Sequence, residues 1–195
     1  MRLLLLARHG QSALNVAGLV NGDPKLDAGL SPLGREEALK LGGQVAAIGI
    51  DLCVTSEFPR AQETAQLALE GRDGIAHEID ARLDDVRIGE LEGRTLADYR
   101  TWKHAHTRQD PFPGGESLDD SALRYADAFE RLLERGEETI LCVCHEIPVR
   151  YAVNAAAGTD DLDRPLHDIA NATPYVFDHA GLERSIRRIR ELIGR

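Results

Sequence analysis

The sequence predicts an α/β fold, a three-layer αβα sandwich with a mostly parallel central sheet. Apolar runs of strand length alternate along the chain with amphipathic helical patterns, which is typical of strands joined by helical crossovers. The first run, Leu3 to Ala7, is apolar without interruption. This pattern predicts a strand that helices cover on both faces. Because the 195 residues contain no repeat, linker or low-complexity segment, we expect one domain, residues 1–195.

Two helices and two further strands are expected after the first strand. Ser31 is a suitable N-cap and Pro32 a suitable first residue for a helix. The apolar face of this helix is predicted to comprise Leu33, Ala38, Leu41, Val45 and Ile48, and Gly49 is expected to end it. Residues 51–55 and 75–79 are predicted strands. Between them, a helix is expected to begin at Pro59 and to turn inward Ala61, Ala65, Ala68 and Leu69.

The middle of the chain alternates between loop and helix signals. Residues 83–93 are rich in charge and glycine and predict a loop, whereas residues 95–106 are expected to be helical. The proline and glycine residues of 111–115 predict a break. Ser117 and Asp120 then form a capping box that begins a helix ending at Gly136. Its buried face is predicted to comprise Leu118, Ala122, Ala126, Phe129 and Leu133.

The last third of the chain adds a buried strand and a helix. Residues 139–144 are the strand, and Pro148 is expected to begin a helix that ends at Gly158. The inward side of that helix is predicted to carry Val149, Ala152, Val153 and Ala156. Residues 175–178 and 182–189 are predicted to form an antiparallel pair around Ala180-Gly181. The alternative is a terminal helix from Leu182 onward.

Composition limits the classes of partner. The net charge of −10 and the isoelectric point near 5.2 argue against binding to nucleic acid or to an anionic membrane. No signal-like or membrane-spanning apolar stretch is present, so we expect a cytoplasmic protein. Three cysteines in apolar runs, Cys53, Cys142 and Cys144, predict reduced and packed thiols. No cysteine and histidine cluster has zinc spacing, and His104 and His106 are expected on a solvated surface.

Candidate chemistry lies where the buried strands end. Arg8, His9 and Gly10 follow the first strand directly, and His145 follows the strand at 139–144. In open α/β folds ligands bind beyond the carboxyl ends of parallel strands, where helix N-termini favour anions such as phosphate. Taken alone, His9 could be a buried core histidine, and Arg60, in the first turn of its helix, could be a solvated charge. Two histidines and two arginines at strand ends together favour an anion site.

Several motifs, in order along the chain, resemble the histidine phosphatase superfamily, the phosphoglycerate mutase-like group. The motifs are Arg8-His9-Gly10-Gln11-Ser12 with Asn15, Leu30-Ser31 with Gly34, Ser56 with Arg60-Ala61 and Thr64-Ala65, Gly89-Glu90-Leu91-Glu92-Gly93, Pro113-Gly114-Gly115-Glu116-Ser117, and Val143-Cys144-His145. The resemblance covers almost the whole chain and implies a phosphoglycerate mutase-like fold. Short motifs are weak singly but specific as an ordered set.

The resemblance implies a role for each candidate residue. His9 would be the nucleophile that forms a phosphohistidine, while Arg8, Arg60, Asn15 and His145 bind the phosphoryl group. Gly22 and Glu146 are further candidate substrate-binding residues. No metal and no cofactor are implied. The partner would be a small phosphorylated metabolite, bound by a monomer or a homodimer.

The proton donor has four candidates in the sequence. The family usually has glutamate where this chain has Asp85, which shortens the reach of the carboxyl group by about 1.5 Å. Asp84, Glu90 and Glu146 are alternatives, and any of the four could instead be a solvated charge. Glu146 also departs from the family, which commonly has glycine after the second histidine.

Three functions remain open in a fixed order of preference. A phosphomonoester hydrolase is preferred because only residues 94–112 separate the acid loop from the next motif, where mutases typically carry a longer insertion. A phosphoglycerate mutase-type phosphotransferase is second, and a noncatalytic phospholigand-binding protein is third. Substrate discrimination is expected in a lid-like segment at about 94–117. Within it, Glu116 and Ser117 are interpreted as helix-capping residues.

Overall fold

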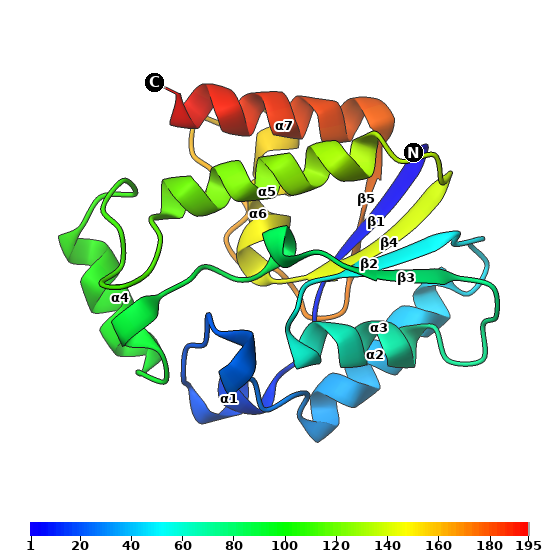
Figure 1. The fold of residues 1–195 in the computed structure, drawn as a ribbon, viewed down its shortest axis with the longest axis horizontal. Coiled ribbons are helices and arrows are strands. Elements are labelled where there is room, and N and C mark those ends of the chain that lie inside the picture. The colour runs from blue at the N-terminus through cyan, green and yellow to red at the C-terminus, as the bar shows by residue number, and fades with distance from the viewer. Residues whose placement is uncertain (195) are drawn as a thin grey trace.

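Five strands form one central sheet in this computed structural model, which describes residues 1–194. Their order across the sheet is β3-β2-β4-β1-β5 (Figure 1). The strands are β1 (Leu3–Arg8), β2 (Leu52–Thr55), β3 (Ala76–Ile79), β4 (Thr139–Cys144) and β5 (Pro174–Asp178). The first four are parallel, and β5 pairs antiparallel with β1. The predicted mostly parallel sheet is confirmed.

Helices cover both faces of the sheet and complete three layers. One face carries α2 (Pro32–Val45) and α3 (Pro59–Ala68), and the other carries α5 (Leu118–Leu133), α6 (Glu146–Ala156) and α7 (His179–Ile193) (Figure 1). Consistent with this, Leu4 and Leu6 of β1 lie in one hydrophobic core while Leu5 and Ala7 lie in the other. The uninterrupted apolar run of β1 therefore reflects burial on both sides. No helix within residues 1–194 is long and apolar enough to cross a membrane.

The remaining elements are short and lie around the carboxyl ends of the parallel strands. They are α1 (Ala13–Ala17), α4 (Leu96–Ala105) and three 3₁₀ turns, η1 (Pro24–Leu26), η2 (Ala81–Leu83) and η3 (Gly89–Leu91). The predicted helix at 95–106 is thus confirmed as α4, and the predicted loop at 83–93 contains part of η2 and all of η3. The three cysteines are buried free thiols, as expected.

Helix caps form as the sequence predicts. The Ser31 hydroxyl accepts a hydrogen bond from the backbone N–H of Gly34 at 3.0 Å. At α5, the Ser117 hydroxyl accepts from the backbone N–H of Asp120 at 2.9 Å, and the Asp120 carboxylate accepts from the backbone N–H of Ser117 at 3.1 Å. Each cap satisfies backbone donors that the first helical turn leaves unpaired.

The predicted antiparallel pair around Ala180-Gly181 is wrong, and the alternative of a terminal helix is right. Residues 179–193 form α7, capped by the Asp178 carboxylate, which accepts from the backbone N–H of Gly181 at 2.7 Å. Leu182, Ile186 and Ile189 are all buried on this helix. Their spacing of four and three residues is helical, and it decides between the two readings because a strand would place Leu182 and Ile189 on opposite faces.

Several predicted boundaries and inward positions also differ from the structure. Leu33 is 49% exposed because it lies in the first turn of α2, and α2 ends at Val45, before Ile48 and Gly49. In α5, Leu132 is fully enclosed and Leu133 only partly, and the helix ends before Gly136. Helix α6 begins two residues before Pro148, and Val153 and Ala156 are only partly buried.

Candidate active site

The parallel register of β1 and β4 brings the two histidines together. Arg8 pairs with Cys144 across the two strands, and the backbone N–H of His9 donates to the Cys144 carbonyl at 2.9 Å. His9 and His145 follow these positions directly, and their ring centroids lie 5.3 Å apart. Both side chains are buried, with relative exposures of 3% and 0%. The strand ends therefore place both imidazoles in one protected site.

The surroundings of His9 fix which ring nitrogen is available. Its Nδ1 lies 2.6 Å from the carbonyl oxygen of Gly10, so Nδ1 carries the proton and donates it there. The Gly10 peptide is itself held, because its N–H donates to the Thr64 hydroxyl at 3.0 Å. A Cβ at Gly10 would lie only 2.3 Å from the carbonyl oxygen of Gly34, so glycine is required for this close approach. The unprotonated Nε2 of His9 thus faces the site.

The Arg60 guanidinium contacts both histidines and several other side chains of the site. Its Nε donates to His9 Nε2 at 3.0 Å, and its Nη2 lies 3.2 Å from His145 Nδ1. Its Nη1 donates to the side-chain oxygen of Asn21 at 2.6 Å and lies 3.4 Å from a carboxylate oxygen of Asp27. The guanidinium also stacks 4.2 Å from the centre of the Phe58 ring. It is only 3% exposed, so the reading of Arg60 as a solvated surface charge is excluded.

Both histidines are held in the neutral form. Burial, reinforced by the positive charges of Arg60 and Arg8, lowers the pKa of His9 well below its usual value. Burial and Arg60 lower the pKa of His145 in the same way. His145 Nε2 lies 2.8 Å from the hydroxyl of Ser56, which follows β2. Each neutral imidazole keeps one ring nitrogen with an unshared electron pair, which can accept a hydrogen bond or act as a nucleophile.

Arg8 is positioned by two acceptors and keeps one donor free. Its Nη1 lies 2.9 Å from a carboxylate oxygen of Glu146 and donates to the carbonyl oxygen of Ile169 at 2.9 Å. Its Nε is buried and has no hydrogen-bond partner among the described residues. An unpaired buried donor costs about 1–3 kcal/mol, so an arriving oxyanion would be bound favourably there.

Of the candidate acids, Asp85 is the one that lies next to His145. Asp85 Oδ2 lies 3.3 Å from Arg60 Nη2 and 3.6 Å from His145 Nδ1, while Oδ1 accepts from the backbone N–H of Val86 at 3.0 Å. Burial raises the pKa of Asp85, against the opposing effect of Arg60. A carboxyl group with a raised pKa is suited to carry a proton.

The neighbouring acids are placed differently. Asp84 is buried and accepts from the backbone N–H of Glu57 at 2.8 Å, and burial raises its pKa to about 6. Glu90 is exposed. Glu146 binds Arg8 rather than either histidine, and its other oxygen accepts from Arg150 Nη1 at 2.9 Å.

Two other predicted binding residues, Asn15 and Gly22, contact neither histidine and hold local structure instead. Asn15 is exposed, and its side-chain oxygen is used in a capping box with Ser12 at the start of α1. Gly22 is buried, and its N–H donates to both carboxylate oxygens of Glu92 at 2.9 Å. A Cβ at Gly22 would lie 2.0 Å from the carbonyl oxygen of Val86. Gly22 therefore allows the loop that carries Asn21 to reach Arg60.

Arg124 of α5 and Glu116, just before that helix, hold the loop that carries Asp84 and Asp85. Arg124 of α5 donates to the backbone carbonyls of Asp84 and Asp85, at 2.9 and 3.2 Å. Glu116 pairs with Arg124 and accepts from the backbone N–H of Arg87 at 3.0 Å. Ser117 caps α5 as predicted, whereas Glu116 forms an ion pair with Arg124 instead of capping the helix.

Four contact residues were not among the predicted site residues. Ser56 contacts His145, Asn21 and Asp27 contact Arg60, and Arg124 holds the loop of Asp85. A sequence signal existed for Ser56, because it follows a buried strand directly, as His9 and His145 do. The other three depend on loop and helix placement, for which the sequence offers no local pattern.

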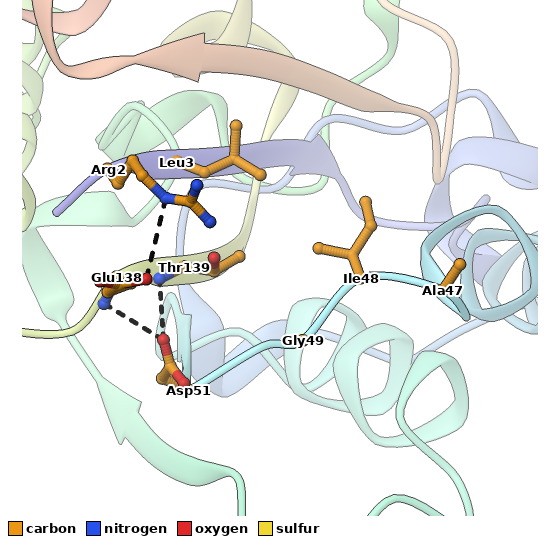
Figure 2. Close-up of a pocket in the computed structure, with 8 residues that line it drawn as sticks. All are labelled: Arg2, Leu3, Ala47, Ile48, Gly49, Asp51, Glu138 and Thr139. Carbon is orange, nitrogen blue, oxygen red and sulfur yellow. Dashed lines mark hydrogen bonds and ion pairs between the residues drawn. The ribbon is translucent and has the colours of Figure 1, made fainter.

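A second concavity lies at the opposite, amino-terminal end of the strands (Figure 2). In it the Asp51 carboxylate accepts from the backbone N–H groups of Glu138 and Thr139, at 3.1 and 2.9 Å. Arg2 and Glu138 lie 3.8 Å apart and are largely exposed. These contacts cap the start of β4 and bring no nucleophile or buried cation together.

Comparisons with known proteins agree with this geometry. The profile of the histidine phosphatase superfamily (branch 1) matches residues 4–191. The chain is 37% identical to the 2,3-bisphosphoglycerate-dependent phosphoglycerate mutase of Azorhizobium caulinodans, with 98% of each chain covered. It is 33% identical to the enzyme of the same name from Methylobacterium sp. (strain 4-46), with 90% of each covered.

Solved structures give the same picture. The α-ribazole phosphatase of Shigella flexneri superposes with a TM-score of 0.77 at 27% identity, covering 90% of each chain. A mycobacterial glucosyl-3-phosphoglycerate phosphatase, solved in complex with VO3, gives a TM-score of 0.75 at 26% identity, covering 90% of this chain and 92% of that one.

Proposed function

Because the chain belongs to the histidine phosphatase superfamily (branch 1), an enzyme family of phosphoryl transfer or hydrolysis, we propose that it is a phosphomonoester hydrolase that uses His9 as its nucleophile. One observation carries this proposal. The His9 imidazole is buried and neutral, donates from Nδ1 to the Gly10 carbonyl, and turns Nε2 toward Arg60. That arrangement supports in-line attack on phosphorus.

In the first step, His9 Nε2 forms a bond to phosphorus as the bond from phosphorus to the ester oxygen breaks. The phosphoryl group carries its charge on three equatorial oxygens, so catalysis depends mainly on positioned positive charge and hydrogen bonds. Arg60 and the free Nε of Arg8 supply donors from two sides. Planar guanidinium groups can each bind two oxygens, which a lysine cannot do. His145 contributes a further contact, and the amide of Asn15 is available from α1.

The departing alkoxide needs a proton, and we assign Asp85 as its donor. The raised pKa of this carboxyl group supports the assignment, and a bound phosphate would raise that pKa further through its negative charge. In the second step a water molecule attacks the phosphohistidine. Asp85, now ionised, accepts a proton from that water, and inorganic phosphate leaves as His9 is restored.

Hydrolysis is preferred to mutase activity for two reasons. The structural neighbours include phosphatases named for two different substrates, and in this chain only residues 94–112 separate the acid loop from the motif at 113–117. The phosphoglycerate mutase names of the sequence relatives support the alternative, a phosphotransferase that needs a bisphosphate primer. We propose a small phosphorylated metabolite as the substrate in either case.

The decisive test is to trap the phosphoenzyme. Incubation with an aryl phosphate is expected to give turnover and an acid-labile phosphoryl adduct, and His9→Ala should lose both by roughly 10³-fold or more. His77→Ala, at an exposed position of β3, is the matched control and should keep both. Absence of turnover by the wild-type protein would contradict the hydrolase. Primer-dependent transfer between hydroxyl groups of a phosphoglycerate would favour the mutase instead.

A further inference from the structure

Glu146 bridges the phosphate-binding arginine to a second arginine. One carboxylate oxygen lies 2.9 Å from Arg8 Nη1, and the other lies 2.9 Å from Arg150 Nη1, four residues further along α6. Arg150 is 5% exposed and pairs in turn with Asp163 at 2.8 Å. Because it is bonded on both sides, Glu146 is a fixed negative charge next to the proposed phosphoryl site. The resemblance implies glycine at this position in the family, where this chain has a carboxylate.

The charges of the site are arranged in depth. The side chains of Arg60 and Arg8 are 4% and 17% exposed, whereas those of Asp85 and Glu146 are 25% and 32% exposed. Of these four side chains, the two arginines lie deeper and the two carboxylates lie nearer to solvent, whereas the Asp27 carboxylate that pairs with Arg60 is fully buried. A phosphoryl group that reaches His9 contacts the arginines, while the organic part of the ester stays closer to the carboxylates.

The paired charges around the histidines also leave no positive excess. Two separate sets of ion pairs, one around Arg60 and one that includes Arg8, together join four arginines to five carboxylates, and both histidines are neutral. The residues are Arg8, Arg60, Arg108 and Arg150, with Asp27, Asp85, Asp119, Glu146 and Asp163. If Asp85 holds a proton for the leaving group, Glu146 is the more exposed carboxylate that pairs with Arg8.

Resting on the proposed hydrolase function, we propose that Glu146 is a specificity-determining residue that selects phosphomonoesters whose organic part carries no further negative charge. A carboxylate or a second phosphate on the leaving group would lie near the negative charge of Glu146 in a partly desolvated site. Like charges repel more strongly there than in water. Neutral or cationic organic groups are accepted. Bisphosphates and phosphorylated acids are disfavoured.

The test compares two ligands that differ by one charge. The probes are 4-carbamoylbenzylphosphonate and 4-carboxybenzylphosphonate, whose carbon–phosphorus bond cannot be hydrolysed, so only binding is measured. Calorimetry on the full chain is expected to give at least about fivefold tighter binding of the amide, the factor that about 1 kcal/mol produces. In Glu146→Gln and Glu146→Gly this ratio should fall toward one. Glu183→Gln, which removes an exposed charge from α7, is the matched control and should keep the wild-type ratio.

The outcomes separate this inference from the function on which it rests. Equal binding of the two phosphonates by the wild-type protein, or a ratio unchanged in both Glu146 variants, overturns the proposal. The proposal is also overturned if the wild-type protein binds 4-carboxybenzylphosphonate more tightly than the amide and Lys103→Gln abolishes this preference. Lys103 of α4, which has no ion pair among the described residues, would then be the residue that selects the ligand. Failure of the wild-type protein to hydrolyse aryl phosphates contradicts the hydrolase function, whatever the binding ratio.

Discussion

Replacing Asp85 with asparagine is expected to slow attack on alkyl phosphates far more than attack on aryl phosphates. An alkoxide is a poor leaving group and needs the proton that Asp85 is proposed to donate, whereas a nitrophenolate leaves without one. General acid catalysis contributes typically about 10²–10⁴-fold to a rate. We therefore expect the rate of phosphoenzyme formation in Asp85→Asn to fall at least about 10²-fold more with the alkyl substrate than with the aryl substrate.

The structure also predicts a smaller loss of rate that is the same for both substrates. The two oxygens of Asp85 face two donors, the backbone N–H of Val86 at 3.0 Å and Arg60 Nη2 at 3.3 Å. An asparagine must turn its own amino group toward one of these donors. The loss of one such hydrogen bond costs about 1 kcal/mol, or about fivefold, on either substrate. The expected result is therefore a small uniform loss with a large additional loss on the alkyl ester.

The assay must isolate the first chemical step. Single-turnover formation of the phosphoenzyme should be measured with 4-nitrophenyl phosphate and with glycerol phosphate, because hydrolysis of the intermediate is common to both. Asp84→Asn is the matched control, since Asp84 contacts the backbone of Glu57 rather than the histidines. Equal losses on the two substrates in Asp85→Asn would refute the reasoning and make Asp85 structural. A leaving-group-dependent loss in Asp84→Asn would move the donor role to that residue.

Four further predictions concern stability and pH. Gly22→Ala should lower the free energy of unfolding by about 2–4 kcal/mol in urea titrations, because its Cβ would lie 2.0 Å from a carbonyl oxygen. Gly43→Ala, where a Cβ meets nothing within 4 Å on α2, should instead stabilise the protein by about 0.5–1 kcal/mol. Asp84→Asn should stabilise the protein by about 1–2 kcal/mol at pH 8. The folded-state pKa of Asp84, about 6, exceeds its unfolded value of 3.8, so ionisation opposes folding at high pH and the gain should vanish below pH 4. A gain that persists there would contradict this origin. Because the pKa of His9 is lowered and that of Asp85 raised, kcat/KM for alkyl phosphates should be higher at pH 5.5 than at pH 8. The acidic limb of that profile should lie below pH 6.5, and a limb centred at or above it would contradict a neutral nucleophile.

The elements that fix the site were predictable because they depend on local patterns. Uninterrupted apolar runs identify β1 and β4 as strands buried on both faces, and parallel pairing then places the residues after them side by side. His9 and His145 lie together for this reason alone. Similarly, α3 places Arg60 in its first turn because Pro59 fixes where the helix begins.

The contacts that tune the site could not be read from the sequence. Asn21 and Asp27 reach Arg60 from an irregular loop whose path depends on a close approach at Gly22. Asn15 follows a motif, but in this structure its side-chain oxygen caps α1, because serine and asparagine three residues apart at a helix start bind each other's backbone. A motif records only residue identities, so it does not show which local hydrogen bonds a side chain will make.

Arg60 connects the resting structure to the proposed chemistry. At rest its Nε–H occupies the electron pair of His9 Nε2, the atom that we propose attacks phosphorus. A phosphate oxygen carries formal charge and is a stronger acceptor for a guanidinium than a neutral imidazole is. Phosphate binding would therefore draw the Arg60 N–H away from His9 and free the electron pair. Because Nδ1 stays bonded to the Gly10 carbonyl, the ring keeps its orientation during this exchange. In this mechanism one arginine protects the nucleophile until the substrate arrives and then stabilises the group being transferred.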